Sequence, residues 1–249
     1  MTERDGQVEE RVAVITGASQ GLGFALAEEL ASRGWRLVLD ARRADRLDRA
    51  AGALHERTTV EAIAGDVTEA THRQALLGAA RKLGRMELLV NNASTLGASP
   101  LPPLDRVDLD VLRRTYEVNL VAPLALVQTF VGALEPGGAV VNITSDAAVE
   151  AYEGWGGYGS SKAALEQASR VLAVEHPEWR VLVVDPGDMR TEMHQDAFPG
   201  EDIGDRPLPQ SSVPGLVALI EGGQPSGRYE ARALPASGSG PAPVPGGPR

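Results

Sequence analysis

Short apolar runs alternate along this chain with longer segments in which apolar residues recur every three or four positions. The short runs predict strands at Arg11–Thr16, Arg36–Asp40, Val60–Ala64, Met86–Asn91, Ala139–Thr144, Arg180–Asp185 and Arg228–Ala231. The longer segments predict helices at Gly21–Arg33, Ala44–Leu54, Glu69–Leu83, Asp105–Ala133, Tyr158–Glu175 and Val213–Glu221. Such alternation is typical of the doubly wound α/β class, so we expect a parallel seven-stranded sheet with helices on both faces.

Three segments fall outside this alternation. Residues 1–10 are polar and are expected to form a flexible N-terminus before a single domain at 11–234. Residues 235–249 contain five prolines and four glycines, so a disordered tail is expected there. The segment 188–212 is long and loop-like, yet it contains Met189, Met193, Phe198 and Ile203. Apolar residues in a long loop are typical of a lid or a binding loop.

Charge and composition exclude several classes of function. The chain has 24 lysines and arginines against 34 aspartates and glutamates, a net charge of −10, and no basic run, so we expect no nucleic-acid partner. With no cysteine, disulfides and thiolate metal sites are excluded, and the four histidines lack metal-ligand spacing, so no metal site is expected. No apolar stretch approaches membrane-span length and no signal peptide is evident, so we expect no membrane partner and a cytoplasmic location.

A glycine-rich turn joins the first predicted strand to the first predicted helix. Gly17, Gly21 and Gly23 follow the strand directly. Glycine allows positive φ angles and a close ligand approach, and a helix N-terminus offers unpaired N–H groups and a partial positive charge. This arrangement favours a pyrophosphate site. The spacing differs from the G-x-G-x-x-G pattern, and a plain glycine-rich turn remains the alternative.

The end of the second predicted strand bears on the choice between NAD and NADP. In dinucleotide-binding folds an acidic residue there binds the ribose 2′-hydroxyl of NAD, whereas an arginine accommodates the 2′-phosphate of NADP. Counting 24 positions from Gly17 reaches Ala41. Because neighbours on a strand point to opposite faces, Asp40 should point away and Arg42 should lie over the phosphate. We therefore predict NADP, with NAD as the alternative.

Tyr158 and Lys162 lie four residues apart in a predicted helix, so both side chains share one face. An adjacent cation favours the phenolate and lowers the pKa of a tyrosine, which can then act as a general acid or base. The chain has 22 arginines but only two lysines, Lys82 and Lys162. A chance lysine at this spacing is therefore rare.

Two further positions are candidates on physical grounds. Ser145 follows a predicted strand, and open α/β sheets bind ligands beyond the carboxyl ends of their strands, so its hydroxyl could donate to a substrate carbonyl. The alternative is a simple turn residue. Pro123 lies within a predicted helix and cannot bond the carbonyl of Asn119, which is then available to a water in a proton relay, unless the proline only kinks the helix.

These motifs resemble those of the short-chain dehydrogenase/reductase family. The matching residues are Thr16-Gly17-x-x-x-Gly21-x-Gly23, Asp66-Val67, Asn91-Asn92-Ala93, Asn119, Ser145, Tyr158-x-x-x-Lys162 and Pro186-Gly187 followed by Thr191. The resemblance implies a Rossmann-type fold. It also implies an NAD(P)-dependent oxidoreductase that moves hydride between the nicotinamide and a carbonyl or alcohol group of a small organic substrate.

The resemblance further implies a role for each matching residue. Catalysis would rest on Asn119, Ser145, Tyr158 and Lys162. Together with Arg42, the cofactor-binding residues would be Gly17, Ser19, Gln20, Gly21, Leu22, Asp66, Val67, Asn92, Ala93, Tyr158, Lys162, Pro186, Gly187 and Thr191. Ser94 stands where the family usually has glycine, and Gln20 where many NADP-preferring members have a basic residue. The NADP prediction therefore depends chiefly on Arg42.

A dinucleotide-binding sensor or scaffold without turnover is the alternative function, because a fold alone does not determine activity. A pure binder would have no need of Ser145, Tyr158 and Lys162 together, so an enzyme is favoured. The resemblance also implies a homodimer or homotetramer, with Asp105–Ala133 and Tyr158–Glu175 as the contacting helices.

Overall fold

The structure, a computed structural model, describes residues 10–234. The expected tail and nearly all of the expected flexible N-terminus lie outside these residues. Seven parallel strands form one sheet in the order β3-β2-β1-β4-β5-β6-β7. The strands are β1 (Arg11–Ile15), β2 (Arg36–Ala41), β3 (Val60–Ala64), β4 (Arg85–Asn91), β5 (Leu134–Ile143), β6 (Arg180–Asp185) and β7 (Gly227–Glu230). The predicted doubly wound fold is confirmed.

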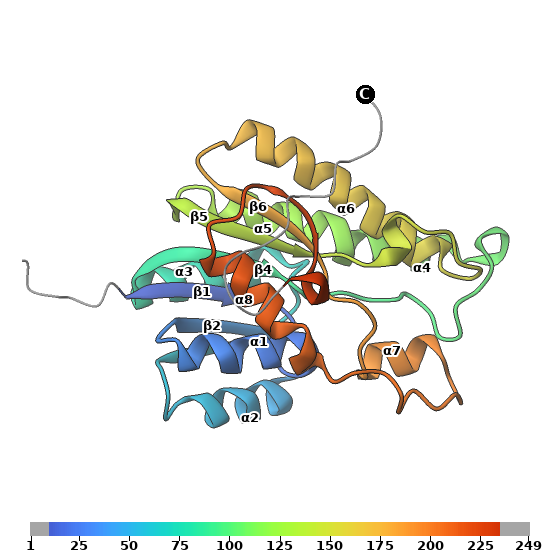
Figure 1. Cartoon of the computed structure of the whole chain (residues 1–249), viewed down its shortest axis with the longest axis horizontal. Coiled ribbons are helices and arrows are strands. Elements are labelled where there is room, and N and C mark those ends of the chain that lie inside the picture. The colour runs from blue at the N-terminus through green and yellow to red at the C-terminus, as the bar shows by residue number, and fades with distance from the viewer. Residues whose placement is uncertain (1–9, 235–249) are drawn as a thin grey trace, which may run out of the picture.

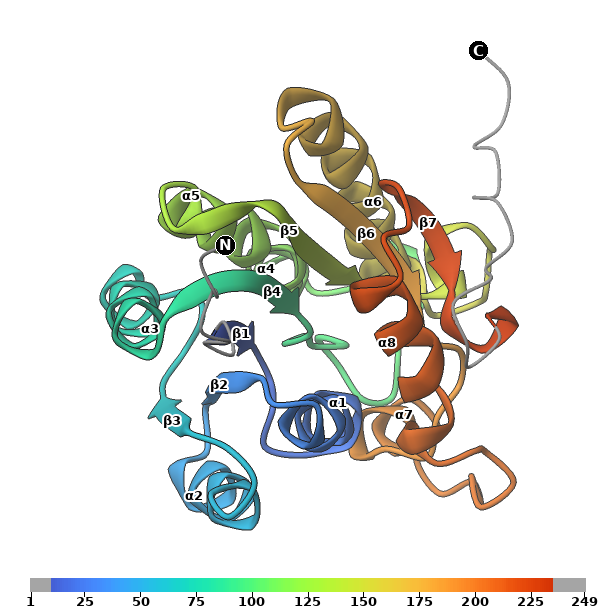
Figure 2. The same cartoon turned by 60° about the vertical axis from the view of Figure 1, so that its left-hand side comes forward.

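Helices cover both faces of the sheet, as the two views show (Figures 1 and 2). One face carries α1 (Gly21–Ser32), α2 (Ala44–Leu54) and α8 (Val213–Glu221). The other carries α3 (Ala70–Leu83), α5 (Ala122–Phe130) and α6 (Gly156–Glu175), with α4 (Leu109–Tyr116) beside α6. The short helix α7 (Glu192–Ala197) lies at the lower right of Figure 1.

Two apolar clusters fill the space between the sheet and its helices. In β1, Ala13 and Ile15 face the cluster under α1 and α8, whereas Val12 and Val14 face the cluster under α3 and α5. All four side chains are fully buried. A strand covered on both faces needs apolar residues at every position, which explains the continuous apolar runs in the sequence. Within the described range, no helix is long and apolar enough to cross a membrane.

The predicted helix Asp105–Ala133 is wrong as a single element. The structure divides it into α4, a π turn at Glu117–Val121, and α5. At the π turn the Ala122 N–H donates to the carbonyl of Glu117, five residues back. Pro123 follows directly and has no N–H to offer. The helical course therefore continues past the proline through one wider turn rather than ending or kinking sharply.

Two other boundaries differ from those predicted by more than one residue, and one helix lies in a segment predicted as a loop. The strand predicted from Ala139 begins at Leu134, and the helix predicted from Tyr158 begins at Gly156. The segment predicted as a loop contains α7, which Thr191 caps by accepting a hydrogen bond from the His194 N–H at 3.2 Å. The remaining strand and helix boundaries agree with those predicted to within one residue.

Close packing of α8 gives a test of the fold. A Cβ on Gly215 would lie 1.8 Å from the carbonyl oxygen of Ala231, so Gly215→Ala should lower the free energy of unfolding by about 1–3 kcal/mol. Gly78→Ala in α3 is the matched control, because nothing lies within 4 Å of its Cβ. Alanine there should stabilise the protein by about 0.5–1 kcal/mol. Urea denaturation measures both changes, and equal stability of the two variants would contradict this packing.

Candidate active site

The candidate site lies where the sheet order changes direction. Strand β1 is flanked by β2 on one side and β4 on the other, and such a switch point leaves a crevice at the carboxyl ends of the strands. A cavity of about 570 Å³ opens there. Every residue predicted for catalysis or cofactor binding lines this cavity except Asn119.

The glycine turn between β1 and α1 forms one end of the cavity. Gly17 and Gly21 have φ angles of 64° and 59°, which glycine adopts without strain. A Cβ on Gly17 would lie 2.9 Å from the Cα of Ala93, so the turn packs directly against the chain that follows β4. The side chain of the N-cap residue Gln20 makes no capping hydrogen bond, which leaves the first N–H groups of α1 available to an anion. The turn therefore fits a pyrophosphate.

Asn92 and Thr16 hold this turn against β4. The Asn92 side-chain amide donates to the carbonyls of Thr16 at 2.9 Å and Gly17 at 3.1 Å. In return, the Thr16 hydroxyl accepts hydrogen bonds from the backbone N–H groups of Asn92 and Ala93, both at 3.0 Å. These reciprocal contacts fix the ends of β1 and β4 relative to each other, so Asn92 has a positioning task of its own.

Asp40 uses its carboxylate inside the fold. The side chain is 2% exposed, and one oxygen lies 2.6 Å from Nε2 of His72 in α3. The other accepts from the Gly17 N–H at 3.4 Å. Burial raises the pKa of Asp40, while the contacts with His72 and Gly17 act in the opposite direction. The carboxylate is thus directed at α3 and the glycine turn.

Three arginines line the phosphate end of the cavity, namely Arg42, Arg43 and Arg46. Arg43 pairs with Asp45 at 3.3 Å, and Arg46 pairs with Glu192 of α7 at 2.7 Å. Arg42 is exposed and forms no ion pair with any residue between 10 and 234. Sequence reasoning missed Arg46, which lies in the first turn of α2, three residues after the N-cap Arg43.

Tyr158 and Lys162 lie one turn apart in α6 and line the opposite end of the cavity. Tyr158 is 8% exposed and Lys162 only 2%. The Lys162 ammonium donates to the carbonyl of Ile143, the last residue of β5, at 2.8 Å. It also lies 5.6 Å from the centre of the Tyr158 ring. The helical spacing therefore brings phenol and ammonium together, as the sequence predicted.

Burial opposes the charged form of both groups. It lowers the pKa of Lys162 to about 8. Burial also raises the pKa of Tyr158, and the negative charge of Asp185 acts in the same direction, whereas hydrogen bonds with Ser94 and Ser145 lower it. The prediction that the lysine brings the tyrosine pKa below its ordinary value is wrong for the protein chain by itself. Removal of water from the phenol and the negative charge of Asp185 dominate its pKa.

Ser145 begins the turn that follows β5. Its hydroxyl donates to the Asp146 carboxylate at 2.8 Å and accepts from the Ala147 N–H at 3.2 Å. The same carboxylate accepts from the Tyr152 hydroxyl at 3.0 Å. Ser145 also lines the cavity, and its side chain is within hydrogen-bond reach of Tyr158. Asp146 is a neighbour that sequence reasoning missed.

Asn119 lies in the π turn and is completely buried. Its side-chain oxygen accepts from the Ser94 hydroxyl at 3.0 Å and the Thr95 N–H at 2.9 Å. Its amide nitrogen donates to the Thr95 carbonyl and the Ser161 hydroxyl, both at 2.9 Å. These contacts occupy the side chain, so the predicted relay could use only the backbone carbonyl.

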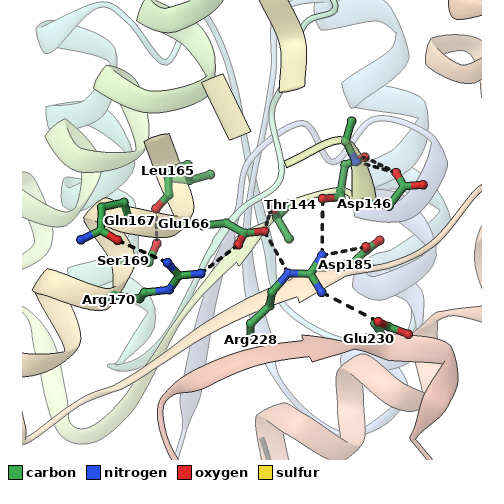
Figure 3. A network of polar contacts seen from close by, with 12 residues as sticks. Thr144, Asp146, Leu165, Glu166, Gln167, Ser169, Arg170, Asp185, Arg228 and Glu230 are labelled. Atoms are coloured by element: carbon green, nitrogen blue, oxygen red, sulfur yellow. Dashed lines mark hydrogen bonds and ion pairs between the residues drawn. The ribbon is translucent and has the colours of Figure 1, made fainter. Parts of the chain in front are cut away.

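A buried ionic network supports the strand ends next to Ser145 (Figure 3). Arg228 of β7 donates to Glu166 of α6 at 3.0 Å and to Asp185 of β6 at 3.1 Å. Glu166 also accepts from the Thr144 hydroxyl at 2.8 Å, and Arg228 reaches the Ser145 carbonyl at 3.5 Å. The network ties three strands and α6 together. Sequence reasoning missed it because no local spacing links these residues.

Comparison with known proteins agrees with this geometry. The family described as short chain dehydrogenase matches residues 11–202. Sepiapterin reductase of Mus musculus is 38% identical over 199 residues, which cover 74% of this chain and 76% of the mouse protein.

Two solved structures resemble the whole fold. An alcohol dehydrogenase from the archaeon Thermococcus sibiricus, in complex with 5-hydroxy-NADP, is 27% identical with a TM-score of 0.79, and the match covers 89% of this chain and 96% of that one. An Escherichia coli protein described as a short chain dehydrogenase, in complex with NADPH, is 26% identical with a TM-score of 0.81, and the match covers 90% and 97% of the two chains.

Burial of Lys162 predicts how stability varies with pH. The unfolded chain keeps the lysine proton up to about pH 10.5, whereas the folded chain releases it near pH 8. The penalty for burying the charge is therefore present in full below about pH 8 and disappears as the pH rises to 10.5. Relative to Lys162→Met, the wild-type free energy of unfolding should rise over this range by up to about 3 kcal/mol.

Urea denaturation of both proteins between pH 7 and 10 measures this difference. Lys82→Met is the matched control, because Lys82 is the other lysine of the chain and is exposed. Its stability should follow that of the wild type at every pH. Parallel curves for the wild type and Lys162→Met would contradict the lowered pKa.

Proposed function

The chain belongs to the short-chain dehydrogenase/reductase family, and from that premise we propose that it is an NADP-dependent oxidoreductase that interconverts a carbonyl group and an alcohol on a small organic substrate. One observation carries the proposal: the glycine turn and the group of Ser145, Tyr158 and Lys162 line the two ends of a single cavity. A bound nicotinamide dinucleotide supplies the hydride chemistry. The protein supplies binding, orientation and proton transfer.

The catalytic roles follow from the positions of these groups. Tyr158 gives its phenol proton to the carbonyl oxygen during reduction and takes one back during alcohol oxidation. The phenol is protonated at neutral pH, as donation requires, but burial raises the pKa of Tyr158 and makes it a weaker acid, so a neighbouring positive charge is needed to favour release of the proton. Lys162 binds the nicotinamide ribose, and its charge stabilises the phenolate left behind. Ser145 orients the carbonyl oxygen once its hydroxyl turns away from Asp146.

We assign the supply of protons to the π turn that precedes α5. The backbone carbonyl of Asn119 lies in the π turn before Pro123, where the missing proline N–H leaves it without its ordinary helical partner. A water held by this carbonyl would return a proton from solvent towards Lys162. The full use of the Asn119 side chain in other contacts supports a role for the backbone rather than the amide.

The preference for NADP is assigned to Arg42. A 2′-phosphate carries close to two negative charges and forms strong hydrogen bonds with a guanidinium. Arg42 lines the cavity without an ionic partner among the described residues, whereas Asp40 is committed to His72 and Gly17. The complexes of the two similar structures with 5-hydroxy-NADP and NADPH support the same preference.

The remaining cofactor contacts follow the cavity from the glycine turn towards Tyr158. Asp66 and Val67 are proposed for the adenine, and Thr191 with Pro186-Gly187 for the nicotinamide carboxamide. The proposed phosphate and ribose contacts are Gly17, Ser19, Gln20, Gly21, Leu22, Asn92 and Ala93.

Steady-state oxidation of NADPH against a panel of ketones and aldehydes tests the function. Sepiapterin belongs in the panel because the similar mouse protein is named for it. Turnover of any member supports the enzyme. Tight NADPH binding with no turnover across the panel would favour the alternative, a dinucleotide-binding sensor or scaffold.

Self-association into a homodimer or homotetramer is also proposed. Val171 and Val174 of α6 are 46% and 81% exposed, and Val121, next to α5, is 43% exposed. Exposed apolar side chains on these helices support a contact between copies, since such patches are costly in water.

Tyr158→Phe should leave the fold and NADPH affinity intact and lower turnover by about 10²- to 10⁴-fold, because only the proton donor is removed. Tyr116→Phe is the matched control, since Tyr116 lies in α4 and does not line the cavity. Turnover with a substrate identified from the panel measures both. Near-normal turnover of Tyr158→Phe would refute the assignment.

Arg42→Ala should raise the Michaelis constant for NADPH at least tenfold and leave that for NADH within a small factor. A charge-assisted hydrogen bond is worth about 1.5–3 kcal/mol, and each 1.4 kcal/mol is about tenfold in affinity. Arg49→Ala removes the same charge from an exposed part of α2 and serves as the control. If the wild type prefers NADH and Asp40→Ala is the damaging change, Asp40 is the ribose ligand instead.

A further inference from the structure

The first residue of α7 reaches across to the phosphate end of the cavity. One oxygen of Glu192 accepts hydrogen bonds from Arg46 at 2.7 Å and from the Gln20 side-chain amide at 2.8 Å. Arg46 also donates to the Gln20 side-chain oxygen. These residues come from α7, α2 and the glycine turn, so the contacts join three elements that are far apart in the sequence.

The helix α7 contacts both ends of the cavity. At the phosphate end, a Cβ on Gly21 would lie 3.6 Å from the Thr191 side chain, so the start of α7 rests directly on the glycine turn. Towards the opposite end, where Tyr158 lies, Met193 and His194 also line the cavity. The Phe198 ring that follows α7 lies 5.0 Å from His194 and 6.0 Å from Trp155. A movement of α7 would therefore change both ends together.

The pair formed by Glu192 and Arg46 is poorly suited to a resident anion. A carboxylate beside Arg46 repels a phosphate and occupies a guanidinium that lines the phosphate end. The two side chains are 60% and 25% exposed, so water and salt weaken their attraction and the pair separates easily. A phosphate brings more charge and more acceptor oxygens than one carboxylate, and it can displace Glu192 from the arginine.

We propose that Glu192, through its ion pair with Arg46, holds α7 against the phosphate end of the cavity, and we call this ion pair the latch. The 2′-phosphate of NADP opens the latch by binding Arg46 in place of Glu192. The second half of this proposal rests on the NADP preference proposed above. NAD has no group that competes for Arg46, so Glu192 is a specificity-determining residue. Release of α7 also frees Met193 and His194, which line the cavity, to adjust around a substrate.

Hydrogen exchange on the ligand-free protein tests the latch without any cofactor. Backbone amides of 192–198 should exchange faster in Glu192→Gln and in Arg46→Met than in the wild type. The second variant leaves the sequence of α7 unchanged, so an effect of Glu192 on the intrinsic stability of the helix is separated from the loss of the pair. Glu201→Gln is the matched control, an exposed acid of the same segment with no contact to Arg46. Wild-type exchange in both latch variants would overturn the latch.

Titration with 2′,5′-ADP and 5′-AMP tests the competition. Glu192→Gln should bind 2′,5′-ADP about two- to fivefold more tightly than the wild type, the range expected from an exposed ion pair, with 5′-AMP affinity unchanged. In the wild type, 2′,5′-ADP should speed exchange in α7 and 5′-AMP should not. An equal change in the affinity of Glu192→Gln for the two nucleotides would overturn the competition. If the wild type binds both alike, the NADP preference fails and the competition with it, while the exchange comparison still decides whether Glu192 holds α7.

Discussion

A lysine ammonium almost completely withdrawn from water is the constraint on which the proposed catalytic end of this protein depends. A buried cation needs a polar partner, and Lys162 finds one in the carbonyl of Ile143, where β5 ends. This contact fixes the register of α6 against the sheet. Helix α6 lies close to the turn after β5, because a Cβ on Gly159 would lie 2.4 Å from the carbonyl oxygen of Ala147 in that turn. The position of Tyr158 beside Ser145 follows from that register.

A second, largely buried ionic group acts on the same strand ends. Arg228 joins Glu166, one helical turn beyond Lys162, to Asp185 at the end of β6. Buried ion pairs contribute little to net stability, because the loss of hydration offsets their attraction. However, separation of the partners is costly, because it leaves a buried charge unpaired. Such pairs therefore favour one arrangement of the elements that carry them. The network therefore serves to hold β5, β6, β7 and α6 in one arrangement around the proposed proton-transfer groups, and Asp185 influences the Tyr158 pKa from within it.

The central strands could be predicted because a strand covered on both faces is apolar at every covered position, as at 12–15 in β1. The break in the predicted helix Asp105–Ala133 could not be predicted from the sequence. A proline indicates a missing N–H group, but it does not indicate whether the helix ends, kinks or widens into a π turn. In the site, the spacing of Tyr158 and Lys162 predicted their proximity. The contacts of Arg228 join residues 62 and 43 positions away, and no local period marks such pairs. The direction of the Tyr158 pKa shift also required the structure, because desolvation depends on packing depth.

The use of lysine at position 162, in a chain with 22 arginines, has a physical reason. A guanidinium is larger, stays charged under all ordinary conditions and presents five donors, which a site 2% exposed with one carbonyl partner could not satisfy. An ammonium is compact, and burial lowers the pKa of Lys162 to about 8, close enough to neutrality for the group to exchange a proton. Arginine suits the phosphate end, where charge must persist and anions are held at the surface. Lysine suits the end proposed for proton transfer, where its charge would stabilise the phenolate of Tyr158.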